Sequence, residues 1–167
     1  MKHIQSGFTL VELMVSVSLC ILLYSVSMVS VQLLEKTMVQ MEMNLLCAAC
    51  NHLQQQAIAT NAIQELSFNA ARSSYAFNGN EHALAKGVCF DVALDAYGPP
   101  SAPYHILEKP ITFKENKIFF YPEGMMSAGM ICFTNSARTI LCALSSAVAH
   151  ASFVRRYRYD GKWHSIS

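Results

Sequence analysis

An uncharged run of 22 residues, Leu13–Leu34, constrains this chain more than any other feature. Extended back to Phe8, the run comprises 27 residues without Pro or Gly, and Glu12 is its only charged residue. As a helix, a segment of this length would be ~40 Å long and would cross the ~30 Å hydrocarbon core of a bilayer. Residues 8–34 are therefore predicted to form a membrane-spanning helix.

Other membrane-targeting signals compete with this prediction. A secretory signal peptide has an apolar core of about 7–15 residues followed by a small-x-small cleavage site, and neither property fits the run. A lipoprotein signal would use Cys20, but Leu19 stands where a small residue is expected. A plain single-span anchor fits the length but leaves Glu12 unexplained. A carboxylate inside a span costs about a few kcal/mol unless it is paired, whereas one at headgroup depth stays hydrated.

The residues around Glu12 carry a family resemblance. The stretch Ser6-Gly7-Phe8-Thr9-Leu10-Val11-Glu12-Leu13, followed by the apolar run, resembles the class III signal of type IV pilins and pseudopilins. The resemblance implies that a prepilin peptidase cleaves after Gly7 and removes residues 1–7 as a leader. It further implies that Phe8 becomes the N-methylated mature N-terminus and that Glu12 is the fifth mature residue.

The same resemblance suggests a partner for Glu12. Cleavage would create an α-amino group on Phe8, which is largely cationic at neutral pH. In an assembled filament, Glu12 could neutralise the Phe8 ammonium of a neighbouring subunit and thereby set the axial register. The partners expected from the resemblance are other pilin or pseudopilin subunits, the prepilin peptidase and an inner-membrane assembly platform.

The topology follows from the short segment before the run. Lys2 and His3 make this end cytoplasmic by the positive-inside rule. The chain is therefore expected to cross the bacterial inner membrane once, with residues 35–167 in the periplasm, and to enter a pilus or pseudopilus afterwards.

Beyond Leu34 the helical pattern continues to about Asn61 but becomes amphipathic. Apolar residues recur every three or four positions, and this stripe is predicted to pack on a sheet of the same domain. The residues assigned to it are Val31, Leu34, Met38, Met41, Leu45, Ala48, and His52 or Leu53. Residues 35–61 are thus predicted to extend the membrane helix.

After Asn61, short β-type runs alternate with turn signals. Helix first and strands afterwards predicts an α+β fold, in which a long N-terminal helix packs on an antiparallel β domain over residues 62–167. This arrangement is pilin-like. The predicted strands are 74–77, 88–94, 111–113, 118–121, 130–134, 139–144 and 152–159.

One stretch of the β region resembles a particular group within the pilin family. Phe120-x-Pro122-x-Gly124, then small residues ending in Gly129, then an apolar strand, resembles minor pilins of the GspH/FimT type. That type occurs in type II secretion pseudopili and in type IV pili, and the motif does not distinguish them.

Six cysteines require an explanation, and most are interpreted as structural. Cys20 is expected to be a small apolar residue of the span. Cys47-x-x-Cys50 has the spacing of a redox, metal or haem site, but no second ligand pair and no directly following His support the metal and haem uses. A local disulfide between the two cysteines is a further alternative and would need a suitable pair of rotamers. Cys132 and Cys142 flank a predicted hairpin turn, so a cross-strand disulfide is a candidate. No metal or cofactor is expected.

The C-terminal region combines basic and aromatic residues and admits two interpretations. Its cations are Arg155, Arg156, Arg158 and Lys162. They are candidates for nucleic-acid contact through phosphate pairing and stacking. Some FimT-type pilins take up DNA with a Gly-Arg-x-Arg-like motif, and here Val154 stands in the place of the glycine. The other interpretation, which is favoured, is a closing hairpin with an Asp-Gly turn and solvated arginines.

Composition and motifs exclude several classes of protein. Charged residues make up 14% of the chain, against roughly 25% in soluble domains. Because 12 Lys and Arg nearly balance 11 Asp and Glu, the net charge of the chain does not indicate an acidic partner. No catalytic motif is found. The predicted function is a structural minor pilin or pseudopilin, and the alternative is a DNA-binding minor pilin of an uptake pilus.

Overall fold

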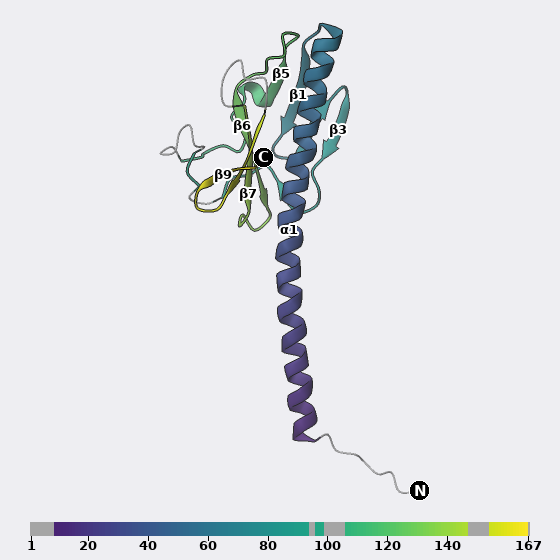
Figure 1. Ribbon diagram of the computed structural model, residues 1–167, viewed down its shortest axis with the longest axis vertical. Coiled ribbons are helices and arrows are strands. Elements are labelled where there is room, and N and C mark those ends of the chain that lie inside the picture. Colours follow the sequence, from purple (N-terminus) through teal and green to yellow (C-terminus); the bar gives the residue numbers. More distant parts are fainter. Residues whose placement is uncertain (1–8, 94–95, 99–105, 147–153, 167) are drawn as a thin grey trace, which may run out of the picture. The chain divides into compact units, whose positions relative to one another are not determined.

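The computed structural model describes residues 9–93, 96–98, 106–146 and 154–166. The chain divides into two compact units, Met1–Glu35 and Lys36–Ser167. One helix, α1 (Leu10–Thr60), supplies most of the first unit and continues into the second (Figure 1). Antiparallel strands follow it, so the predicted α+β fold with a helix packed on a C-terminal β domain is confirmed.

The first unit is an apolar helix whose polar side chains are satisfied locally. Side chains from Leu10 to Leu34 are exposed wherever they are described, and the segment is long and apolar enough to cross a membrane. Five serine hydroxyls donate hydrogen bonds of 2.8–3.0 Å to carbonyls three or four residues earlier in the helix. Because these hydroxyls need no water, the serines remain compatible with a hydrocarbon environment. They are Ser16, Ser18, Ser25, Ser27 and Ser30.

The end of α1 agrees with its predicted end to within one residue. Asn61 adopts a positive φ of 49°, a left-handed conformation that asparagine tolerates better than most residues. The N–H of Ala62 then donates to the carbonyl of Ala57 over 3.3 Å and closes the last turn.

In the second unit, the predicted apolar stripe of α1 is confirmed at Met38, which packs against the core, and at Leu53, which is buried, but it is wrong between them. Met41 and Leu45 are 59% and 47% exposed, and Ala48 is exposed as well. The buried stripe is offset from these three residues by one or two positions, which is a turn of about 100–200° around the helix axis. It comprises Val39, Met43, Leu46, Cys50, Leu53 and Ala57. This part of α1 therefore carries apolar side chains on two faces, and only one face meets the domain's core.

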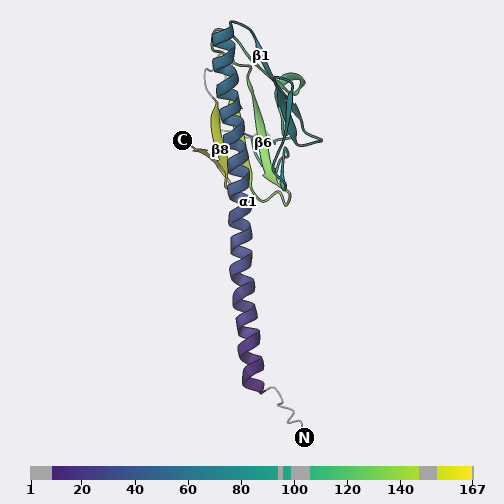
Figure 2. The ribbon, with the colours of Figure 1, turned by 90° about the vertical axis from the view of Figure 1, so that its right-hand side faces the viewer.

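The β strands form two antiparallel sheets beside α1 (Figure 2). The first sheet has the order β3-β2-β1-β5, and the second has the order β4-β6-β7-β8-β9. The strands are β1 (Gln64–Asn69), β2 (Ser74–Phe77), β3 (Asn80–Ala83), β4 (Val88–Cys89), β5 (Lys117–Phe120), β6 (Gly129–Asn135), β7 (Leu141–Ser146), β8 (Arg155–Tyr159) and β9 (Trp163–Ile166). A short 3-10 helix, η1 (Lys114–Asn116), precedes β5.

The main core joins the helix to both sheets. The buried stripe of α1 packs with Leu66 and Phe68 of β1, Phe133 of β6 and Leu144 of β7. A second, smaller cluster lies on the other face of the second sheet and includes Met130, Cys132, Leu141, Ala143 and Tyr157. All of β7 and nearly all of β6 are buried because these strands are covered on both faces.

The strand predictions are confirmed for the central elements and wrong at others. The predicted strands at 74–77, 118–121, 130–134, 139–144 and 152–159 correspond to β2, β5, β6, β7 and β8, the last within the described residues. Of the predicted 88–94 strand only Val88–Cys89 pairs, and 111–113 supplies a single bridge from Ile111 to Ile131. The closing hairpin favoured for the C-terminal region is confirmed, because β8 pairs with β9 on either side of Asp160-Gly161. Sequence patterns missed β1 and β3.

Candidate functional site

The start of α1 is organised by a reciprocal pair of polar residues. The Glu12 carboxylate accepts hydrogen bonds from the backbone N–H and from the hydroxyl of Thr9, each at 3.1 Å. The Thr9 hydroxyl oxygen in turn accepts from the N–H of Glu12 at 3.3 Å. This is a capping box, in which a threonine before the helix and a glutamate three residues later satisfy each other's free donors. The Thr-x-x-Glu spacing is a signal that the sequence interpretation overlooked.

The capping box bears on the role predicted for Glu12. Gly7 and Phe8, the predicted cleavage and methylation positions, lie outside the described residues. Thr9 follows Phe8 directly, so the carboxylate that binds the Thr9 N–H is directed toward the end of the chain that cleavage would expose. A carboxylate at a helix N-terminus also interacts favourably with the helix dipole.

The glycines of the second motif have structural roles. Gly124 has a φ of +79° within the turn that follows β5, a conformation that side chains other than glycine rarely adopt. At Gly129, a Cβ atom would lie 2.5 Å from the ring of Phe113. A tight turn thus requires glycine at position 124, and the close packing of the first residue of β6 on the ring of Phe113 requires glycine at position 129.

The candidate disulfide between Cys132 and Cys142 is not supported by the sheet register. Cys132 lies opposite Ala143, and Cys142 lies opposite Phe133. The one-residue offset places the two thiols on opposite faces, because side chains alternate along a strand. Cys142 accordingly belongs to the main core and Cys132 to the smaller cluster, and both are free thiols.

The cysteines that face the cores are poor nucleophiles. Burial raises the pKa of Cys132 to about 12 and that of Cys142 to about 11. Burial also raises the pKa of Cys50 strongly, with a further contribution from Cys47. Thiols held in the neutral form fit a packing role. Within the described ranges, no group of three His, Cys, Asp or Glu residues could hold a metal ion.

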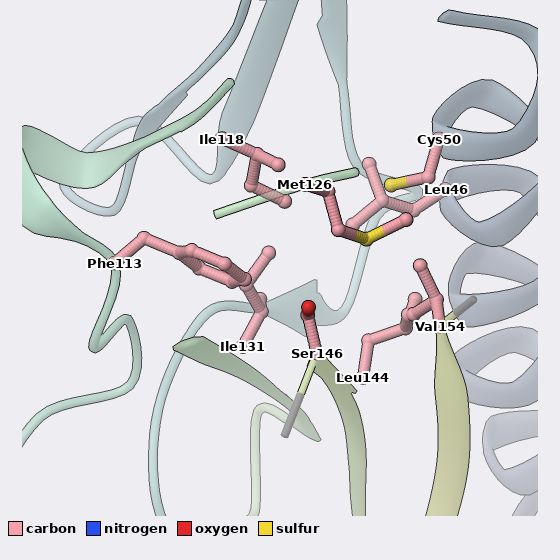
Figure 3. A pocket seen from close by; sticks show the side chains of 9 residues that line it. All are labelled: Leu46, Cys50, Phe113, Ile118, Met126, Ile131, Leu144, Ser146 and Val154. Carbon is pink, nitrogen blue, oxygen red and sulfur yellow. The ribbon is translucent and has the colours of Figure 1, made fainter. Parts of the chain in front are cut away.

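A cavity at the centre of the main core is too small for a ligand. Figure 3 shows its apolar lining and the hydroxyl of Ser146. Its volume is about 10 Å³, which is close to the minimum that a single water requires. The Ser146 hydroxyl has no hydrogen-bond partner among the described residues. The lining residues are Leu46, Cys50, Phe113, Ile118, Met126, Ile131, Leu144, Ser146 and Val154.

The basic residues of the C-terminal hairpin are divided between two faces. Arg156 and Arg158 lie opposite Leu144 and Cys142 and share the α1 side of the sheet, whereas Arg155 lies opposite Ser145 on the other face. The Arg156 guanidinium donates to Asn44 Oδ1 of α1 over 3.0 Å. Lys162 is exposed in the turn between β8 and β9. Of the predicted nucleic-acid residues, Arg155 therefore lies apart from Arg156 and Arg158.

An additional cation joins Arg158 on the α1 side. Both Lys36 and Arg158 act on Cys142, where they partly oppose the increase in pKa that burial causes. Sequence reasoning missed Lys36 because it lies 122 positions before Arg158, and only the packing of α1 on the second sheet brings the two together.

Comparisons with known proteins address the N-terminal segment alone. Residues 2–23 match the family described as the prokaryotic N-terminal methylation motif, which is the class III signal of type IV pilins and pseudopilins. No curated protein and no solved structure matches the chain.

Proposed function

We propose that this chain is a minor pilin or pseudopilin, a structural subunit of a type II secretion pseudopilus or a type IV pilus. The observation that carries the proposal is that the N-terminal methylation motif, residues 2–23, overlaps the first part of an uninterrupted helix of 51 residues. The motif itself supports a type IV pilin-like protein and suggests a structural subunit rather than an enzyme. The class III signal and the long apolar helix suit an inner-membrane anchor.

The unburied apolar surface of α1 supports an assembly role. Large apolar side chains are exposed along the first unit, for example Leu10 at 76% and Leu22 at 64%. Exposed apolar surface of this extent needs lipid or protein to cover it. In the proposed cycle, the bilayer covers residues 8–34 before assembly, and the helices of neighbouring subunits cover them afterwards. The serines of this segment allow close approach between helices.

The second apolar face of α1 extends this surface into the proposed periplasmic domain. Met41, Leu45 and Ala48 are exposed on a side that does not meet the core. We assign this stripe to contact with adjacent subunits, because its apolar character is not explained by packing within the domain.

The proposed role of Glu12 combines the capping box with charge pairing. In the free chain the carboxylate binds Thr9. In the filament, it neutralises the Phe8 ammonium of a neighbouring subunit, which offsets part of the cost of burying both charges. The prepilin peptidase and an inner-membrane platform are the further partners of this cycle.

The assignment to the GspH/FimT type rests on the residue pattern from Phe120 to Gly129. The turn at Gly124 and the contact between Gly129 and Phe113 explain why these positions are glycines. The DNA-capture alternative draws less support, because Arg155 is separated from Arg156 and Arg158 by the sheet. A gel shift with the full-length chain in detergent tests it, and the absence of a salt-sensitive shift would remove it.

Incorporation into filaments tests the proposed function. The chain is produced with the peptidase, platform and major subunit of a pilus or pseudopilus system, and sheared filaments are probed for it. The proposal predicts that the chain co-purifies with filaments only when the peptidase is active. Its absence from filaments of every such system, despite normal cleavage, would contradict the proposal.

A further inference from the structure

Cationic side chains gather where β8 meets the start of the second unit's helix. Lys36, Gln40 and Asn44 follow one another at four-residue intervals and so lie along one side of α1. Arg156 of β8 is bonded to Asn44, the last of these, and Figure 2 shows β8 running beside α1. Two residues further along β8, Arg158 acts together with Lys36 on the thiol of Cys142. From Arg156 to Arg158, β8 thus runs from the level of Asn44 on α1 back toward the level of Lys36.

The β8–β9 turn continues in this direction and adds a further cation. Lys162 is exposed in the turn, and His164 lies opposite Arg158 on the same face. We name the set Lys36, Arg156, Arg158 and Lys162 the cationic edge. The neighbouring acids are Glu35, next to Lys36, and Asp160, in the turn. The edge therefore carries an excess of positive charge.

Chain connectivity places one end of the cationic edge at a bilayer surface. Lys36 follows Leu34, the last residue of the uncharged run, by two positions on the same helix. Two helical residues advance about 3 Å, whereas the headgroup layer extends roughly 5–8 Å beyond the hydrocarbon core. If residues 8–34 span the membrane, Lys36 lies among the headgroups, and within the second unit Arg158 and Lys36 both act on Cys142.

Aromatic residues on the other face of the same hairpin suit this location. Tyr159 lies opposite Trp163, and their ring centroids are 5.1 Å apart. The indole N–H of Trp163 donates to the carbonyl of Tyr97 over 2.8 Å, and Tyr97 is 53% exposed. Tyr and Trp are enriched at the headgroup level of membranes, where an apolar ring with a polar edge is stable.

We propose that the cationic edge binds the phosphate groups of anionic phospholipids and holds the domain on the membrane surface before assembly. The inference rests on the proposed function, because it requires residues 8–34 to be embedded in a bilayer. Assembly would then have to break these lipid contacts. The cationic edge would therefore stabilise the subunit in the membrane relative to the subunit in the filament.

Trp163 provides a direct test, because it is the only tryptophan of the chain. The full-length protein is reconstituted into vesicles of phosphatidylcholine, or of equimolar phosphatidylcholine and phosphatidylglycerol. Both contain a trace of lipid with a nitroxide on its headgroup, which quenches nearby tryptophan fluorescence. The proposal predicts stronger quenching of Trp163 in the anionic vesicles, and loss of the difference at about 1 M salt, where the Debye length is ~3 Å.

The variant Arg158→Gln/Lys162→Gln removes two charges of the edge without altering the Arg156–Asn44 bond. Each neutralised cation is expected to lower the ratio of docked to undocked domains roughly 5-fold. The matched control, Lys109→Gln/Lys114→Gln, removes two exposed lysines from the segment that leads into β5 of the other sheet, and should quench like the original chain. Circular dichroism checks that each variant is folded.

The outcomes separate this inference from the proposed function. If the chain floats with vesicles but Trp163 is quenched equally with and without phosphatidylglycerol, the lipid inference is wrong and the proposed function still stands. An equal loss of Trp163 quenching in the control variant would also overturn the inference, because the effect would then not depend on the cations of the edge. Failure of the chain to float with vesicles would contradict the anchor and both proposals. If the edge variant abolished a DNA gel shift but left lipid quenching unchanged, nucleic acid would replace lipid as its ligand.

Discussion

The carboxylate of Glu12 accepts two hydrogen bonds of 3.1 Å from Thr9, one from its N–H and one from its hydroxyl. Glu12 thus has a role within its own chain in addition to the pairing proposed between subunits. The two roles differ in chemistry, because a capping box needs only an acceptor at this position, whereas neutralising an ammonium needs a negative charge.

Substitutions at these two positions separate the roles. Glu12→Gln keeps an acceptor for the cap but removes the charge, and we expect it to abolish or strongly reduce incorporation into filaments. Thr9→Ala removes the capping hydroxyl and should weaken the first turn by ~1 kcal/mol, with a smaller effect on assembly. The measurement is the amount of each cleaved variant in sheared filaments. Equal incorporation of Glu12→Gln and the original chain would contradict the charge-pairing role.

The exposed stripe of α1 gives a second prediction. Leu45→Asp places a charge on the face proposed to contact other subunits, so it should reduce incorporation into filaments while leaving thermal unfolding within about 1–2 °C. Asn80→Asp, at an exposed position of β3, is the control and should assemble normally. By contrast, Leu46→Asp buries a charge in the core and should unfold the domain. Normal assembly of Leu45→Asp would show that the stripe is not an interface.

Gly129 offers a test of the motif that resembles GspH/FimT proteins. Gly129→Ala drives a methyl group against the ring of Phe113, and we expect a loss of roughly 1–3 kcal/mol in the free energy of unfolding. Urea denaturation of the full chain in detergent measures this loss. The second substitution Phe113→Leu should recover part of it by making space. If Gly129→Ala had no effect, the close packing would not be the reason for a glycine at this position.

The buried thiols predict how stability depends on alkaline pH. Their pKa values in the folded chain, about 12 for Cys132 and about 11 for Cys142, exceed the ordinary value of 9.0. Above pH 9 the unfolded chain therefore releases these protons first, and the free energy of unfolding falls as the pH rises from 9 toward 11 and 12. The Cys132→Ala/Cys142→Ala variant should lose stability less steeply over this range. Identical pH dependence in both proteins would contradict the assignment.

The long helix and the central strands could be predicted because their signals are local. The uncharged run and Asn61 delimit α1, and β6 and β7 are apolar throughout since both faces are covered. β3 escaped prediction because it is an edge strand with every residue exposed, so it shows no alternation. β1, which pairs with β2 and β5 in the same sheet, alternates only weakly, with Leu66 and Phe68 as its buried residues.

The errors at the candidate sites arise from relationships that a linear pattern does not contain. Apolar residues occupy two faces of α1, and spacing alone did not indicate which face meets the core. Cys132 and Cys142 flank one hairpin, but the register of β6 and β7 offsets them by one residue and so separates their side chains. Lys36 joins Arg158 only through tertiary packing.

The intact mass of the chain in cells with and without an active prepilin peptidase tests the central claim most directly. The account predicts that the active enzyme removes residues 1–7 and leaves a product that begins at Phe8 and carries one added methyl group. The control Gly7→Val should retain the leader in both cells. A full-length mass for the original chain in the presence of the active peptidase would contradict the account.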